Sequence, residues 1–131
     1  MEKIFWIADD DADDRMIIKE AFEENNNRQT LSFFENGEMV LARFKEGLES
    51  SNYPSLLILD LNMPKVNGFE LLEKIKKNDK IKHIPIVILS TSKNNIDREK
   101  VLSLGADDFI TKPFSFDHMI KITKELIEKY G

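Results

Sequence analysis

The stretch Leu-Leu-Ile-Leu-Asp at residues 56–60 decides the fold, because four consecutive apolar residues are followed at once by a carboxylate. A short, continuous apolar run is typical of a strand that is buried on both faces, as in the middle of a parallel sheet. Two more runs have this form: residues 4–8 are followed by Asp9, and residues 86–89 are followed by Ser90. The sequence therefore predicts three central strands that each end at a polar side chain.

Weaker strand candidates and helical segments alternate with these runs. Residues 31–34 and 108–111 are the weaker strands, and apolar residues at helical spacing occupy residues 16–22, 39–48, 69–76, 96–104 and 119–127. The residues expected to face the sheet include Met16, Ile17, Ala21, Phe22, Met39, Val40, Phe44, Leu48, Ile96, Val101 and Leu104. Such alternation over short connections indicates one α/β domain, a parallel sheet with helices on both faces. Gly105 is expected to be a left-handed cap after the fourth helix.

The composition excludes several classes of function. The chain of 131 residues has a net charge of −5, and its lysines and arginines are interleaved with acids, which argues against a nucleic-acid-binding surface. The sequence has no cysteine, which excludes thiolate metal sites and thiol nucleophiles. No apolar run approaches the roughly 20 residues of a membrane-spanning helix, and the N-terminus does not resemble a secretory signal. We expect a cytoplasmic protein without membrane insertion that is a monomer at rest.

The residues that follow the predicted strands are expected to carry the chemistry, because ligands of an open parallel sheet bind beyond the carboxyl ends of its strands. They are carboxylates, a hydroxyl and a lysine: Asp9, Asp10, Asp11, Asp60, Ser90 and Lys112. Carboxylates about 4 Å apart repel one another by roughly 4 kcal/mol per pair at an effective dielectric constant near 20. A Mg²⁺ ion, which binds carboxylates, waters and phosphate oxygens, removes that repulsion. The pattern predicts an Asp nucleophile for phosphoryl transfer, with a lysine for the phosphoryl oxygens.

Four motifs resemble the signature of the response-regulator receiver domains of two-component signalling. They are Ile-Ala-Asp-Asp-Asp at residues 7–11, Leu-Asp-Leu-Asn-Met-Pro at residues 59–64, Ser90, and Ile-Thr-Lys-Pro-Phe at residues 110–114. The motifs occur in the order of that family, and the resemblance covers essentially the whole chain. It implies a flavodoxin-like, five-stranded parallel sheet of strand order 2-1-3-4-5. It also implies that residues 1–131 are a single receiver domain with no output domain, similar to single-domain chemotaxis regulators.

The resemblance implies a role for each acidic residue of the site. Asp60 is implied to be the phosphoacceptor. Asp9 and Asp10 are implied to be the acidic pair of the Mg²⁺ site, in which Asp10 binds the ion directly and Asp9 largely through water. Asp60 and the backbone carbonyl of Asn62 are implied to be further ligands. Lys112 is implied to pair with Asp60 at rest and with the phosphoryl group afterwards.

The resemblance also implies a conformational switch. Ser90 is expected to donate its hydroxyl to a phosphoryl oxygen, and Phe109 is expected to move inward with it. The Lys112–Pro113 peptide bond resembles one that is cis in the family. Phosphorylation is then expected to alter the surface of the fourth helix, the fifth strand and the fifth helix, and so to change binding to a downstream protein target or to a second copy of the chain.

These expectations describe a signalling switch and not an enzyme that acts on outside substrates. The phosphoryl donor is expected to be a histidine kinase or a histidine phosphotransfer protein. One alternative is a receiver-like binding module that is not phosphorylated, but such modules usually lose a residue of the kind that Asp10, Asp60 and Lys112 supply here. Another alternative is a metal-dependent phosphatase, which would turn over an aryl phosphate many times.

A calcium-binding EF-hand loop is a near match that fails on physical grounds. Acidic residues occupy positions 1, 3, 5 and 12 of such a loop: Asp9, Asp11, Asp13 and Glu20. Position 6, where the loop needs glycine for a sharp turn, is Asp14. We therefore interpret Asp13 and Asp14 as acids that are favoured at a helix N-terminus.

Overall fold

Five strands and five helices alternate along residues 3–46 and 52–131, the part of the chain that this computed structural model describes. In chain order they are β1 (Ile4–Ala8), α1 (Ala12–Glu24), β2 (Thr30–Phe34), α2 (Gly37–Lys45), β3 (Leu56–Leu59), α3 (Gly68–Lys76), β4 (Ile86–Ser90), α4 (Asn95–Ser103), β5 (Asp108–Thr111) and α5 (Phe116–Tyr130). All neighbouring strands are parallel, and their order is β2-β1-β3-β4-β5. The predicted flavodoxin-like sheet is confirmed.

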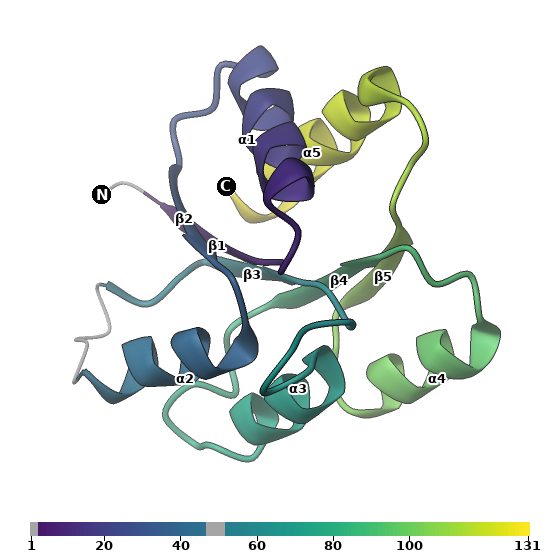
Figure 1. Cartoon of the computed structure of the whole chain (residues 1–131). Helices are drawn as coiled ribbons and strands as arrows, with labels where there is room; N and C mark the ends of the chain where they lie inside the picture. Colours follow the sequence, from purple (N-terminus) through teal and green to yellow (C-terminus); the bar gives the residue numbers. More distant parts are fainter. Residues whose placement is uncertain (1–2, 47–51) are drawn as a thin grey trace.

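The helices cover both faces of the sheet, with α1 and α5 on one face and α2, α3 and α4 on the other (Figure 1). Alternate residues of each strand enter the two apolar cores, because successive side chains of a strand point to opposite faces. In β1, for example, Phe5 and Ile7 pack with α1 and α5, while Trp6 packs on the other side. Both faces of the central strands are thus buried, which explains why their sequences are apolar throughout.

Trp6 of β1 is a core residue. Its ring lies 5.0 Å from the ring of Phe34 and 4.7 Å from that of Phe44, between centroids. The side chain is almost fully buried, and so is that of Val40 on α2. These residues attach α2 to the outer part of the sheet.

Gly68 sets the position of the loop that follows β3. Its backbone N–H donates a hydrogen bond of 3.0 Å to the carbonyl of Leu61. A Cβ atom at this position would lie 2.4 Å from the carbonyl oxygen of Asp60 and 2.6 Å from the Cα of Leu61, closer than side-chain carbons approach other atoms. Glycine therefore allows the start of α3 to lie directly against the backbone of Asp60. At the end of α4, Gly105 has a φ of 109°, which confirms the predicted left-handed cap.

The buried side of α1 differs from the prediction. Met16 and Ile17 were expected to face the sheet, but they are 61% and 39% exposed. Ile18 is only 2% exposed and forms the buried side together with Ala21 and Phe22. Three consecutive apolar residues cannot all face the sheet, and packing of α1 against α5 decides which of them does.

Two residues expected to face the sheet from other helices are also exposed. Met39 on α2 and Ile96 on α4 lie at the surface, whereas Val101 is the buried residue of α4. Leu48 lies outside the described residues. Single apolar residues at the surface are normal in soluble proteins, so the pattern alone does not distinguish them from core residues.

The two neighbouring isoleucines of α1 allow a direct test of this register. We expect Ile18→Ala to lower the free energy of unfolding by about 2–5 kcal/mol, because it opens a cavity in the core. Ile17→Ala makes the same chemical change on the exposed side, and its effect should be below about 1 kcal/mol. Urea denaturation of both variants measures the difference, and equal losses would contradict the register described here.

Candidate functional site

The first two carboxylates of the site are brought together by the pairing of β1 with β3. Ala8 and Leu59 are register partners, and the backbone N–H of Asp60 donates to the carbonyl of Ala8 at 3.0 Å. Asp9 and Asp60 therefore leave adjacent strands side by side at the carboxyl edge of the sheet. Both side chains are buried, which is unusual for carboxylates that lack a partner.

Asp10 completes a cluster that can hold a divalent cation. One carboxylate oxygen from each of Asp9, Asp10 and Asp60 lies within 4.8 Å of the others, and Asp10 is exposed to solvent. An all-oxygen, anionic donor set of this kind suits hard cations such as Mg²⁺ or Mn²⁺, and the open side leaves space for the waters that Mg²⁺ retains. Asn62 lies beside the cluster, because its backbone N–H donates to Oδ1 of Asp60 at 3.4 Å. That its carbonyl is a ligand stays a prediction.

Lys112 places one ammonium among three carboxylates. Its Nζ atom lies 2.7 Å from Oδ2 of Asp9, 2.8 Å from Oδ2 of Asp14 and 3.3 Å from Oδ2 of Asp60. The backbone N–H of Lys112 donates to the carbonyl of Ser90 at 2.7 Å, which fixes the end of β5 beside β4. The ion pair expected between Lys112 and Asp60 is present, at the longest of the three distances. All three donors of the ammonium point to carboxylates.

Sequence reasoning missed the contact between Asp14 and Lys112. Asp13 and Asp14 do lie in the first turn of α1, where acids are favoured, and Asp11 is the N-cap residue. Asp14, however, is four residues before Ile18, so it continues the buried side of the helix towards the site. The signal was present in the helical period, but the wrong register for α1 concealed it.

Burial and charge act on the ionisation of the site in opposite directions. Burial raises the pKa of Asp9 to about 6, although hydrogen bonds from Lys112 and from the backbone N–H of Asp11 oppose the shift. Burial acts to lower the pKa of Lys112, but the hydrogen bonds to Asp14 and Asp9 outweigh it and raise that pKa above its ordinary value. The ammonium therefore stays charged, and Asp9 carries the penalty of desolvation.

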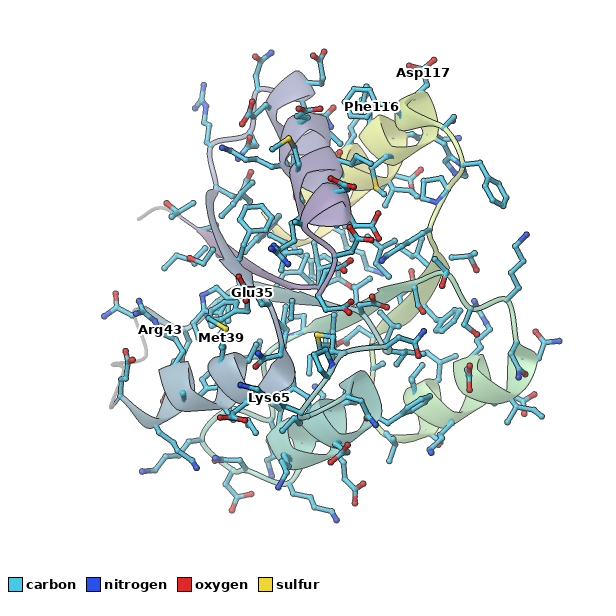
Figure 2. The ribbon with its side chains drawn as sticks, in the orientation of Figure 1. Glu35, Met39, Arg43, Lys65, Phe116 and Asp117 are labelled. Atoms are coloured by element: carbon cyan, nitrogen blue, oxygen red, sulfur yellow. The ribbon has the colours of Figure 1, made fainter. Side chains whose placement is uncertain are left out.

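Arg15 holds the end of β1 from the helix side, and sequence reasoning did not identify it. Its Nη1 atom donates to the carbonyl of Asp9 at 2.7 Å. Its Nη2 atom lies 3.9 Å from Oε1 of Glu35, which follows β2 and is labelled in Figure 2. This contact ties the start of α1 to the strand end that carries the acidic pair.

The two predicted switch residues lie on β4 and β5. Ser90 is the last residue of β4 and is fully buried, and its hydroxyl oxygen accepts a hydrogen bond from the backbone N–H of Ser92 at 3.3 Å. Phe109 is buried and packs in the core on the α2, α3 and α4 side of the sheet. Arg98 of α4 donates to the carbonyl of Phe109 at 3.1 Å. The movement of Phe109 stays a prediction.

The expected cis peptide bond is wrong for this structure, because the Lys112–Pro113 bond is trans. The trans form of an X–Pro bond is favoured by only about 0.5–1 kcal/mol, so a motif alone does not settle the isomer. Within the described residues, no helix is long and apolar enough to cross a membrane.

The raised pKa of Asp9 predicts how stability depends on pH in the metal-free protein. The folded state binds a proton at Asp9 more tightly than the unfolded state, so this residue contributes stability below about pH 4 that is lost as the pH rises through about 6. We expect the unfolding free energy of the wild type, minus that of Asp9→Asn, to fall by about 2–3 kcal/mol between pH 4 and pH 7 in a chelator. Urea denaturation measures it, and a difference that is constant or grows with pH would contradict the shift.

Comparison with known proteins agrees with this geometry. The family model of the response regulator receiver domain matches residues 5–124. The probable methanogenesis regulatory protein FilR2 of Methanothrix harundinacea is 30% identical over 127 residues, which are 95% of this chain and 81% of that protein. Response regulator Rcp1 of Synechocystis is 29% identical over 93% of this chain and 84% of that protein. Other relatives are longer: the chain spans 8% of histidine kinase P4 of Formosa agariphila.

Solved structures of response regulators have the same fold. The phosphorylated cyanobacterial phytochrome response regulator RcpA matches with a TM-score of 0.88 and 30% identity, over 99% of this chain and 94% of that chain. The Mn²⁺-bound form of response regulator Rcp1 matches with a TM-score of 0.83 and 28% identity, over 95% of this chain and 91% of that chain. The extent of these matches, together with the acidic cluster and its lysine, leads to one conclusion: the chain belongs to the response regulator receiver domain family of two-component signalling.

Proposed function

We propose that this chain is a phosphorylation-dependent switch whose phosphoacceptor is Asp60. The observation that carries the proposal is the position of the Asp60 carboxylate, which lies between a cluster able to hold a cation and the ammonium of Lys112. A carboxylate oxygen of Asp60 attacks the phosphorus of a phosphohistidine. The new O–P bond forms as the P–N bond breaks, and the imidazole leaves with the bonding electron pair.

Asp9, Asp10 and Asp60 are the residues that would hold Mg²⁺, with the carbonyl of Asn62 as a further ligand. Their oxygen donors fit a hard divalent cation, and the similar Rcp1 has a Mn²⁺-bound form. When bound, Mg²⁺ would supply positive charge that stabilises the phosphoryl group during transfer. The carboxylates of Asp9, Asp10 and Asp60 repel a phosphoryl group, and the positive charge of the cation would offset this repulsion before transfer.

Lys112 and Ser90 then bind the phosphoryl oxygens. Lys112 already contacts Asp60, so its ammonium needs only a small movement to reach an oxygen on the new phosphoaspartate. Ser90 ends β4, the strand next to β3, and its hydroxyl is available at the same edge of the sheet. Asn62 and Ser92 flank the site and are expected to influence the lifetime of the phosphorylated state.

The output surface comprises α4, β5 and α5. Arg98 joins α4 to β5 through the carbonyl of Phe109, so a change at β5 reaches α4 directly. Apolar side chains are exposed around this surface: Ile96 on α4 is 72% exposed, Phe114 after β5 is 94% exposed, and Phe116 is the first residue of α5 (Figure 2). Their exposure suits binding of a downstream protein target or of a second copy of the chain. The chain itself does not act on outside substrates.

The acceptor can be tested by the mass of the intact protein after incubation with acetyl phosphate. We expect one added phosphoryl group in the presence of Mg²⁺, none in a chelator, and none in Asp60→Asn, because that variant lacks the nucleophile. Beryllofluoride, which mimics the phosphoryl group, should bind the wild type if the adduct decays quickly. Failure of both reagents would favour the alternative of a binding module that is not phosphorylated.

The cation site can be tested separately by thermal denaturation. At a Mg²⁺ concentration ten times the dissociation constant, binding adds about 1.4 kcal/mol of stability and should raise Tm by several degrees. Asp10→Ala should abolish this rise while relieving some repulsion in the metal-free protein. Asp13→Ala is the matched control, since Asp13 is an exposed acid outside the cluster. A wild-type Tm that does not change with Mg²⁺ would count against the site.

A further inference from the structure

We propose that Asp14 is a positioning residue for Lys112, and that it keeps the ammonium at the site when a divalent cation binds Asp9 and Asp60. This inference rests on the proposed function, because it concerns the same lysine and the same cation site. Asp14 lies on α1, and it is a fourth carboxylate of the site beside Asp9, Asp10 and Asp60.

The contacts of Lys112 divide into two kinds. Asp9 and Asp60 belong to the cluster that can hold a cation, and Lys112 lies 2.7 Å and 3.3 Å from them. Asp14 is not part of that cluster, yet its Oδ2 atom lies 2.8 Å from the ammonium. Lys112 therefore shares two of its partners with the cation and has one partner that the cation does not need.

The position of Asp14 is set by the backbone at the start of α1. Oδ1 of Asp11, the N-cap residue, accepts hydrogen bonds from the N–H of Asp13 at 2.8 Å and from that of Asp14 at 3.3 Å. Nη1 of Arg15, the next residue, donates a hydrogen bond to the carbonyl of Asp9 at 2.7 Å. These bonds hold the first turn against the end of β1, so the carboxylate of Asp14 is in place before any cation binds.

Competition between two cations gives Asp14 its effect. A divalent cation that binds Asp9 and Asp60 repels the ammonium and takes over the carboxylates that neutralise it. Without Asp14, the ammonium of Lys112 would have two alternatives. It could keep its contact with Asp9, where it would repel the cation, or it could move out of its mostly buried position. With Asp14, the ammonium keeps a charged hydrogen bond and remains within reach of an oxygen on Asp60. Asp14 therefore allows the lysine and the cation to occupy the site together.

The test is isothermal titration of Mg²⁺ into the wild type, Asp14→Asn and the control Asp13→Asn, without any phosphoryl donor. Both variants lose one negative charge in the same helical turn, but of these two aspartates Asp14 contacts Lys112 and Asp13 has no ion pair with it in the described part of the chain. We expect Asp14→Asn to weaken Mg²⁺ binding roughly ten-fold, as loss of an outer-shell partner typically does, and Asp13→Asn to have less than about a two-fold effect. Equal effects of the two variants would overturn the proposal.

The Lys112→Met background distinguishes an effect of Asp14 through Lys112 from a direct effect of its charge on the cation. If Asp14 acts through Lys112, Asp14→Asn in this background should weaken Mg²⁺ binding no more than Asp13→Asn does. An undiminished ten-fold effect would mean that Asp14 acts on the cation directly, which contradicts a positioning role. Asp14→Glu, which keeps the charge, should retain most of the affinity of the wild type.

Unfolding of the metal-free protein gives a readout that does not depend on binding. A double-mutant cycle of Asp14→Asn and Lys112→Met in a chelator should reveal coupling between the two side chains, and additive effects would overturn the proposal. Failure of the proposed function has a different signature. In that case the wild type would take up no Mg²⁺ or no phosphoryl group, whatever the coupling between Asp14 and Lys112.

Discussion

Three carboxylates that meet a single ammonium, with a fourth carboxylate beside them, are the constraint on which this structure depends. Asp9, Asp14 and Asp60 surround Lys112, and Asp10 lies beside two of them. Such an arrangement has excess negative charge in a partly buried place, and the fold alone gains nothing from it. Added cationic charge would offset this excess, which is the physical argument for the metal ion in the proposed phosphoryl transfer.

The fold gathers polar side chains at the carboxyl edge of the sheet, because the central strands are buried along their length. Both faces of the central strands are covered by helices, so side chains within β1, β3 and β4 are almost all apolar. Polar groups can appear only where a strand ends, and parallel strands end at the same edge. The close contact of Gly68 with the backbone of Asp60 then fixes one carboxylate, while the bonds of Arg15 and Asp11 fix the start of α1 around the others.

The three central strands and the polar residues that end them were predictable because burial on both faces leaves an unambiguous apolar run. The strand order, in contrast, came from resemblance to a family, since periodicity says nothing about which strands are neighbours. The register of α1 was not predictable, because Met16, Ile17 and Ile18 are equally apolar and tertiary packing selects one of them. The same uncertainty explains why the contact of Asp14 with Lys112 was not predicted. The contact of Arg98 with a backbone carbonyl carries no signal in the sequence.

If the hydrogen bond from Arg98 to the carbonyl of Phe109 couples α4 to the acidic site, as proposed, that coupling is reciprocal. A partner that binds α4 and favours one arrangement of this bond would then change the affinity of the acidic site for a cation, and cation binding would change the affinity for the partner by the same factor. A downstream target would then change the properties of the acidic site, in addition to responding to its phosphorylation. The fraction of phosphorylated molecules in a cell would therefore depend on how much target is present, as well as on the activity of the kinase.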